Sequence, residues 1–372
     1  WWPPANLFFY HNMFASQRIR FHACVIIEAI IFLEAFDMKQ TVILGGYTKK
    51  TGAGIYSANF DSANGSISTP EPFVTGVKNP TYLAISKANF AYACAAGDGE
   101  GGLATIDLNQ NPAKIINTTF SKGGSPAHVS IDEARQLVFA SFYHDGRAVV
   151  YKIQADHTLV EVDRAVHGGS GPRPEQDASH VHYSALAPDG RLVLVDLGND
   201  TLSTYPVSDA GKLGKATVLH LPVGYGPRHI AFLNDHLAYL VGELSSQISV
   251  LHYDNGAFTI GDTRATIPAT WTEHNGAAAI RISADGKFVY VSNRGYDSMA
   301  VFALKDGGLH LELIQQIPVQ GSFPRDFNFD LTQKYLLVVN QNTDNATLYR
   351  RDEATGKLTW LQADIPAPEA VN

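Results

Sequence analysis

The sequence is poor in cysteine and in charged residues. Only two cysteines occur among its 372 residues, Cys24 and Cys94. This excludes a framework of disulfide bonds and a cysteine-rich zinc site, and it favours a reducing compartment, so we expect a cytoplasmic protein. Charged residues make up 17% of the chain, against about 25% in a typical protein, which argues against a disordered chain or a coiled coil. The net charge of −8 argues against nonspecific binding to nucleic acids, which requires a basic surface.

Long hydrophobic runs are also lacking. The apolar run at 21–36 contains Glu28 and Glu34, and it is shorter than the roughly 20 apolar residues that a membrane span requires. Glu28 also interrupts what could be the core of a signal peptide, and no small-residue cleavage site follows. We therefore expect neither a membrane anchor nor a secretion signal. We interpret residues 1–37 as an extraneous or disordered leader, with an amphipathic extra helix as the alternative, and residues 38–372 as one domain.

A single pattern recurs from residue 38 to the end of the chain. Each unit begins with a small residue or proline, continues with an apolar strand, a polar turn and a second strand, and adds two further strands. Turns such as Asp189-Gly190 and Asp285-Gly286 are strong hairpin signals. Seven units of roughly 48 residues with four antiparallel strands each predict an all-β, seven-bladed propeller. The second strands end at Tyr47, Ala96, Tyr143, Gly198, Glu243, Arg294 and Gln341.

The two ends of the repeat complement each other. The segment Thr41–Tyr47 corresponds to the second strand of a unit, and Ala367–Val371 matches the start of a first strand. The C-terminal strand is therefore expected to complete the first blade. Such closure protects the strand edges that an open array of blades would expose.

Two rows of residues are expected to surround one mouth of the channel, because the first strand of a blade begins where the second strand ends. One row consists of the second-strand ends given above, from Tyr47 to Gln341. A purely structural repeat would place similar small or apolar residues at equivalent positions, whereas here Arg228, Arg294 and Arg325 gather at one mouth. Arginine stays charged and binds phosphate or carboxylate through a planar fork, so we expect a small anionic ligand. The other row lies at the start of the first strands and consists of Thr81, Ala127, His182, Arg228, Ala278, Arg325 and Glu369.

Other side chains at this mouth could assist chemistry. Glu243 is either an ion-pair partner that orients an arginine or a general base. His182 is the other candidate base, since the reference pKa of histidine is about 6.5. His128 and His229 lie one position further along their strands, where they either form hydrogen bonds between blades or contact the substrate.

Other kinds of site have weaker support. His180 and His182 lie on the same side of a strand, as metal ligands can, but no convergent group of Asp and Glu accompanies them, so we expect no metal. The glycines between 97 and 102 lack the lysine and the helix of a phosphate-binding loop. No Gly-x-Ser-x-Gly motif indicates a serine hydrolase. Tyr47 and Tyr143 are expected to pack rather than react.

Several segments resemble one known family, the propeller-type lactonases, over residues 38–372. The family includes bacterial 6-phosphogluconolactonases and fungal carboxymuconate cycloisomerases. The resemblance implies a site made of His182, Arg228, Glu243 and Arg294, with Arg325 as an additional anion contact and no metal or cofactor. The run Ala277-Ala278-Ala279 departs from the family, which usually has an acidic or polar residue there. The segments that carry the resemblance are Glu175–His182, Gly224–His229 followed by Val241–Leu244, Asp285–Gly295 and Phe323–Phe327.

The resemblance implies hydrolysis of 6-phospho-D-glucono-1,5-lactone to 6-phosphogluconate, a step of the pentose phosphate pathway. In that reaction arginines bind the phosphate or polarise the lactone carbonyl, and Glu243 or His182 activates water. One alternative is a muconate-type lactonising cycloisomerase, which would use the same arginines on carboxylates. The other is a non-enzymatic binding propeller, although the chain has no Trp-Asp pair of the kind such propellers repeat. The oligomeric state does not follow from the sequence.

Overall fold

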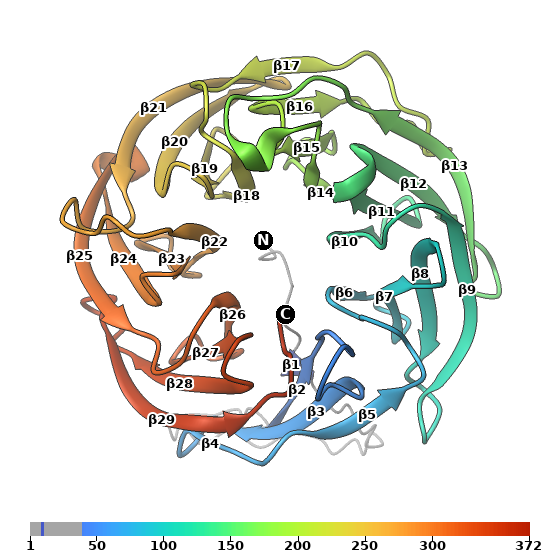
Figure 1. Ribbon diagram of the computed structural model, residues 1–372, viewed down its shortest axis with the longest axis horizontal. Helices are drawn as coiled ribbons and strands as arrows, with labels where there is room; N and C mark the ends of the chain where they lie inside the picture. The colour runs from blue at the N-terminus through green and yellow to red at the C-terminus, as the bar shows by residue number, and fades with distance from the viewer. Residues whose placement is uncertain (1–8, 11–38) are drawn as a thin grey trace, which may run out of the picture.

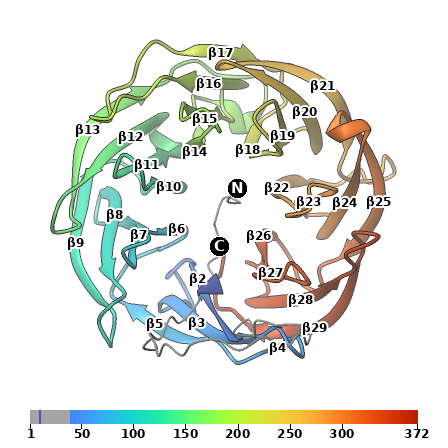
Figure 2. The same cartoon turned by 180° about the vertical axis from the view of Figure 1, so that it is seen from behind.

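Seven antiparallel sheets are arranged as blades around a central axis (Figure 1). The structure is a computed structural model that describes residues 9–10 and 39–372. Within these residues, six sheets contain four strands each, which run in chain order from the centre outward, and the seventh sheet contains five. Figure 2 shows the same closed ring from behind. The predicted all-β, seven-bladed propeller is confirmed.

The blades follow one another along the chain, and the strand bounds are as follows. Blade 1 contains β1 (Phe9–Tyr10), β2 (Lys39–Leu44), β3 (Gly54–Asp61), β4 (Ser66–Ile67) and β5 (Glu71–Thr75). Blade 2 contains β6 (Leu83–Ile85), β7 (Phe90–Ala96), β8 (Glu100–Asp107) and β9 (Lys114–Lys122). Blade 3 contains β10 (His128–Asp132), β11 (Leu137–Phe142), β12 (Arg147–Ile153) and β13 (Leu159–Val166). Blade 4 contains β14 (Val181–Leu186), β15 (Leu192–Asp196), β16 (Thr201–Tyr205) and β17 (Thr217–His220).

The last three blades repeat the same order. Blade 5 contains β18 (Pro227–Phe232), β19 (Leu237–Gly242), β20 (Gln247–Asp254) and β21 (Ala257–Ala265). Blade 6 contains β22 (Gly276–Ile282), β23 (Phe288–Arg294), β24 (Ser298–Lys305) and β25 (His310–Pro318). Blade 7 contains β26 (Pro324–Phe329), β27 (Tyr335–Asn340), β28 (Asn345–Arg351) and β29 (Leu358–Pro366). Short 3-10 turns occur at η1 (Tyr143–Asp145), η2 (Pro174–Gln176) and η3 (Asp306–Gly308), and among the described residues no helix has the length and apolar character of a membrane span.

Burial explains the apolar character of the second strand in each unit. Every residue of β11, β15, β19, β23 and β27 is buried. These strands are covered on both faces by neighbouring blades, so they read as continuous apolar runs rather than alternating ones. Most residues of the outermost strands are exposed or half-buried, because one face of these strands meets solvent.

The C-terminal segment closes the ring as predicted. The Gly45 amide donates to the carbonyl of Asn372 at 2.9 Å, and the Val371 amide donates to the carbonyl of Gly45 at 2.9 Å. The inner edge of β2 is also paired with β1, where Phe9 is opposite Val42. Apart from these two β1 residues, the predicted leader lies outside the described residues, so the interpretation of residues 1–37 stays a prediction.

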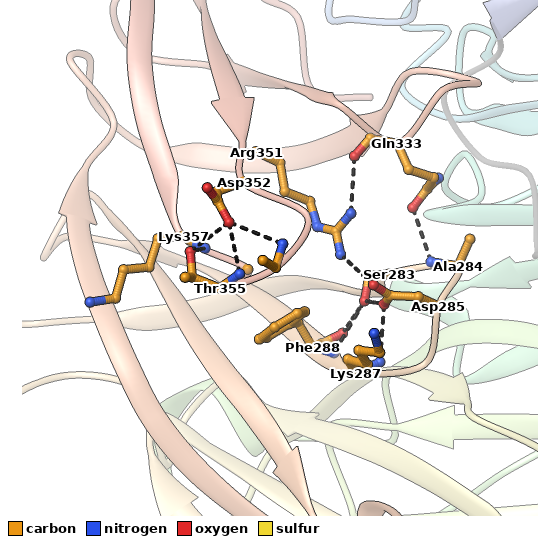
Figure 3. Close-up of polar contacts among 12 residues, drawn as sticks. Ser283, Ala284, Asp285, Lys287, Phe288, Gln333, Arg351, Asp352, Thr355 and Lys357 are labelled. Carbon is orange, nitrogen blue, oxygen red and sulfur yellow. Dashed lines mark hydrogen bonds and ion pairs between the residues drawn. The ribbon is translucent and has the colours of Figure 1, made fainter.

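Figure 3 shows the contacts of Arg351, a buried arginine that joins blades 6 and 7. The turn between β22 and β23 that it binds lies at the end of blade 6 opposite to Arg294. The Arg351 Nη2 lies 3.0 Å from Asp285 Oδ2, in the turn between β22 and β23. Its Nε donates to the Tyr290 hydroxyl at 2.9 Å, and its Nη1 donates to the carbonyl of Gln333 at 3.2 Å. Because every part of the guanidinium is used within the protein, this arginine is a structural link between blades.

Candidate active site

Three of the predicted mouth residues occupy β-bulges at the start of the innermost strands. In β14, Val181 is opposite Asp196 and Tyr183 is opposite Val195, so His182 is the extra residue. The same irregularity leaves Arg228 unopposed in β18 and Arg325 unopposed in β26. A bulge changes the direction of the side chain that it carries. Each bulge therefore changes the direction of one polar side chain, that of His182, Arg228 or Arg325, relative to its neighbours in the strand.

Two of the arginines converge on one carboxylate oxygen. The Nε of Arg228 lies 3.0 Å from Glu243 Oε2, and the Nη2 of Arg294 lies 2.8 Å from the same oxygen. Glu243 directly follows β19, and Arg294 ends β23, so the group joins blades 5 and 6. The arginine side chains are 3% and 8% exposed, whereas Glu243 is 20% exposed. Glu243 is therefore an ion-pair partner of both arginines, one of its two predicted roles.

Arg294 is held by further contacts with blade 6 and blade 7. Its Nε donates to the carbonyl of Gly276 at 3.1 Å, and its Nη2 donates to the carbonyl of Ala277 at 3.3 Å. The guanidinium carbon also lies 5.1 Å from the centre of the Phe323 ring. The three-alanine run that departs from the family pattern thus contributes a backbone oxygen to the site.

Gly276 leaves the space that this arrangement needs. A Cβ added at Gly276 would lie 2.9 Å from Arg294 Nη2 and 3.4 Å from Glu243 Cγ. We expect the Gly276→Ala variant to displace the guanidinium and to lower kcat/KM by about tenfold while the protein stays folded. The measurement is steady-state lactone hydrolysis together with thermal unfolding. Gly168→Ala is the matched control, since its Cβ would meet nothing within 4 Å, and equal activity of both variants would contradict the expectation.

Arg325 lies at the seam between blade 7 and blade 1, with neutral partners. Its Nη1 donates to the Tyr47 hydroxyl at 3.1 Å and to Gln341 Oε1 at 3.0 Å. The ammonium of Lys49 lies 4.2 Å from the centre of the Tyr47 ring. Burial alone would raise the pKa of Tyr47, but Arg325, Lys49 and Arg228 together bring it below its usual 10. Tyr47 was expected only to pack, and Lys49 lies outside both predicted rows.

His182 lies among the arginines and is almost fully buried. It is 5% exposed, and its Nδ1 has no hydrogen-bond partner among the described residues. Burial lowers the pKa of the imidazole well below 6.5, and Arg228, Arg325 and Arg294 lower it further. The ring is therefore neutral at neutral pH and has a lone pair available to accept a proton.

His128 and His229 lie in a deeper layer of rings, with exposures of 0% and 1%. The His128 ring centre is 4.0 Å from that of Tyr183, which in turn is 5.1 Å from that of His229. The Ser184 amide of blade 4 donates to His128 Nδ1 at 3.5 Å, and His229 Nε2 is 3.3 Å from Arg228 Nη1. The Ser184–His128 hydrogen bond joins blades 4 and 3, whereas the contact of His229 with Arg228 stays within blade 5, and contact of either histidine with substrate stays a prediction.

His180 does not combine with His182 as a metal pair. Its Nε2 lies 2.8 Å from Asp177 Oδ1, and its Nδ1 lies 3.0 Å from the carbonyl oxygen of Tyr143. Both ring nitrogens are thus used within the protein. In the part of the chain that the structure describes, no three His, Cys, Asp or Glu side chains form a group that could hold a metal.

The site carries an excess of positive charge. Burial would raise the pKa of Glu243, but Arg294 and Arg228 outweigh it and lower the pKa below 4.5, so the carboxyl is ionised. Burial and the neighbouring Arg294 lower the pKa of Arg228 to about 9, which leaves it charged at neutral pH. Arg294, Arg228 and Arg325 all act electrostatically on the carboxylate of Glu243. Such a site favours a bound anion and stabilises negative charge that develops during a reaction.

Fold and site together define a seven-bladed β-propeller in which one histidine, three arginines and one glutamate gather at one mouth of the channel. The chain belongs to the lactonase family of 7-bladed β-propellers, whose family model matches residues 41–372. This membership indicates a hydrolase.

Known relatives span nearly the whole propeller. The 6-phosphogluconolactonase of Bacillus subtilis is 37% identical over 336 residues, which cover 88% of this chain and 96% of the relative. The crystal structure of a Lactobacillus plantarum protein is similar with a TM-score of 0.87 and 50% identity, covering 90% of this chain and 98% of that one. The structure of the periplasmic gluconolactonase of Pseudomonas aeruginosa is similar with a TM-score of 0.83 and 28% identity, and the match covers 90% of this chain and 98% of that one.

Proposed function

We propose that the protein hydrolyses 6-phospho-D-glucono-1,5-lactone to 6-phosphogluconate at the arginine-rich mouth, without a metal. The observation that carries the proposal is the convergence of Arg228 and Arg294 on Glu243 beside neutral His182. The Bacillus subtilis 6-phosphogluconolactonase, at 37% identity, supports the phosphorylated substrate. On this proposal the protein acts in the cytoplasm, in the pentose phosphate pathway. Acceleration of lactone hydrolysis by the purified protein tests it.

The arginine pair suits the step in which the lactone carbonyl becomes tetrahedral. Attack of water places a negative charge on the carbonyl oxygen, and a fixed cation in a dry site stabilises that charge best. Arg294 is fixed by the carbonyl of Gly276 and by Glu243, so its orientation exists before the substrate arrives. Donors of this kind commonly contribute about 10²–10³ in rate.

His182 is the proposed general base, and Glu243 is a positioning residue. The imidazole takes a proton from the attacking water, and it returns this proton to the ring oxygen when the C1–O bond breaks. The product is an open-chain acid, which ionises and releases one proton to solvent. Glu243 is already engaged in ion pairs with Arg228 and Arg294 through its Oε2, and it serves to hold both guanidinium groups at the carbonyl.

The lowered pKa of His182 predicts the pH profile. A base must be unprotonated to act, and this imidazole is unprotonated at pH 6.5, because burial and three arginines hold its pKa well below that value. With glucono-1,5-lactone, which has no ionisable group in this range, we expect kcat/KM to stay level from about pH 7.5 to pH 6. The measurement is proton release at each pH after subtraction of spontaneous hydrolysis. An activity that is half lost at pH 6.5 would contradict the assignment.

A further inference from the structure

A second cationic group lies at the seam between blades 7 and 1, and it consists of Arg325, Tyr47 and Lys49. We propose that this group binds the phosphate of the substrate, while Arg228 and Arg294 act at the lactone carbonyl. The inference rests on the proposed function and assigns the two ends of the substrate to different blades.

The distribution of carboxylates separates the two groups. Arg228 and Arg294 share Glu243, which cancels part of their charge. The contacts of Arg325 at the seam are with a hydroxyl and an amide oxygen, both neutral. Among residues 39–372, no carboxylate lies within 4.0 Å of the Lys49 ammonium. The two arginines of the Glu243 cluster are thus both in direct ion pairs, whereas the guanidinium of Arg325 contacts only neutral groups and remains free to pair with a phosphate.

The seam group also offers donors of the right kind. The Tyr47 hydroxyl accepts a hydrogen bond from Arg325, so its own proton is available to an incoming oxygen. Arg325 is half-buried and Lys49 is exposed, which places a fixed fork and a mobile ammonium beside one hydroxyl. A phosphate has three acceptor oxygens, and charge-assisted hydrogen bonds from arginine and lysine to phosphate are stronger than neutral ones.

The loop that carries Lys49 is fixed on both sides. The carboxylate of Glu369 accepts from the amides of Lys50, Thr51 and Gly52 at 2.7, 3.1 and 3.1 Å. The amide of Thr48 donates to Asn79 Oδ1 at 3.0 Å. The backbone around Lys49 is thus in place before a ligand binds, which reduces the entropy lost on binding. Burial would raise the pKa of Glu369, but the hydrogen bonds from these amides lower it below 4.5, so the carboxyl is ionised and places one negative charge in the Lys49 loop.

The position of the seam fits a substrate with two ends. Figure 1 shows blades 7 and 1 next to each other, with blade 5, which contains β18, two blades away from blade 7. Arg325 is nevertheless near enough to affect the pKa of both His182 and Glu243. In 6-phospho-D-glucono-1,5-lactone the ring oxygen joins C1, which carries the carbonyl, to C5, which carries the phosphorylated C6, so the two groups flank the ring oxygen. This proximity of carbonyl and phosphate matches Arg294 and Arg325, which belong to the neighbouring blades 6 and 7.

The test compares two neighbouring lysines by binding of the stable products. Titration calorimetry with 6-phosphogluconate and with gluconate is performed on the wild type, Lys49→Met, Tyr47→Phe and Lys50→Met. We expect Lys49→Met to weaken 6-phosphogluconate binding by about 10- to 100-fold and to lower the preference of the protein for 6-phosphogluconate over gluconate. Tyr47→Phe is expected to change both quantities in the same direction. Lys50→Met is the control, because its side chain is exposed and lies outside the group. Thermal unfolding checks the fold of every variant.

The outcomes separate this inference from the proposed function. Equal weakening by Lys49→Met and Lys50→Met, or a wild type that binds both products alike, would overturn the phosphate subsite. Selective loss in Lys49→Met, combined with no hydrolysis of any lactone by the wild type, would keep the subsite and reject the hydrolase. If the wild type hydrolyses the lactone and Lys49→Met keeps the wild-type preference for 6-phosphogluconate over gluconate, the phosphate subsite is rejected and the hydrolase is kept.

Discussion

Replacement of His182 by alanine is expected to lower kcat by about 10²–10⁴, the usual contribution of a general base, with a smaller change in KM. The imidazole is 5% exposed and neutral, and it lies among three arginines. Removing it leaves the cationic site for the substrate but no group to take the proton from water. The measurement is steady-state hydrolysis of 6-phospho-D-glucono-1,5-lactone by wild type and variant.

Two controls distinguish lost chemistry from a disturbed fold. Added imidazole is expected to restore part of the kcat of His182→Ala, because the variant leaves a cavity of the size of the missing ring. His220→Ala removes an exposed histidine from the outer strand β17 and is expected to keep wild-type turnover. If His182→Ala retains kcat within about threefold, the assignment of the base is wrong.

Replacement of Glu243 by glutamine is expected to lower kcat/KM by about 10²–10³, the cost of losing a fixed donor at the developing oxyanion. The amide keeps the shape of the side chain but loses the charge that draws Arg228 and Arg294 to one oxygen at 3.0 and 2.8 Å. Both arginines then repel each other and leave the carbonyl position. Kinetics and thermal unfolding are measured together, because an uncompensated buried charge also lowers stability.

Asp285→Asn is the matched control for Glu243→Gln. It breaks an ion pair of similar length, 3.0 Å, with the buried Arg351, at the end of blade 6 remote from the site (Figure 3). We expect it to lower the melting temperature without the loss of kcat/KM. If the two variants lose stability alike and keep activity alike, Glu243 has only a structural role.

The blade repeat was readable in the sequence because its signals are local. Apolar strands of similar length and Asp-Gly turns such as Asp285-Gly286 recur at a nearly constant period, and closure of the ring follows from matching the two ends of the repeat. Once the repeat was aligned, strand ends from distant parts of the chain were assigned to one mouth. The structure places Arg228, Glu243 and Arg294 together there.

The details of the site depend on contacts that no local pattern encodes. A bulge arises from a mismatch between two paired strands, so the extra residue Arg228 in β18 could not be distinguished from a regular position. Tyr47 and Arg325 are 278 residues apart in sequence and meet only because the ring closes. Lys49 lies in the loop beyond the strand end, where a repeat alignment gives no register.

The most direct test of the central claim is proton release from freshly prepared 6-phospho-D-glucono-1,5-lactone, with and without EDTA, after subtraction of spontaneous hydrolysis. Glucono-1,5-lactone and a carboxymuconate are measured in parallel with the same protein. We predict acceleration that EDTA does not change and that is greatest for the phosphorylated lactone. Folded protein that accelerates none of the lactones, or that acts only on the carboxymuconate, would contradict the account.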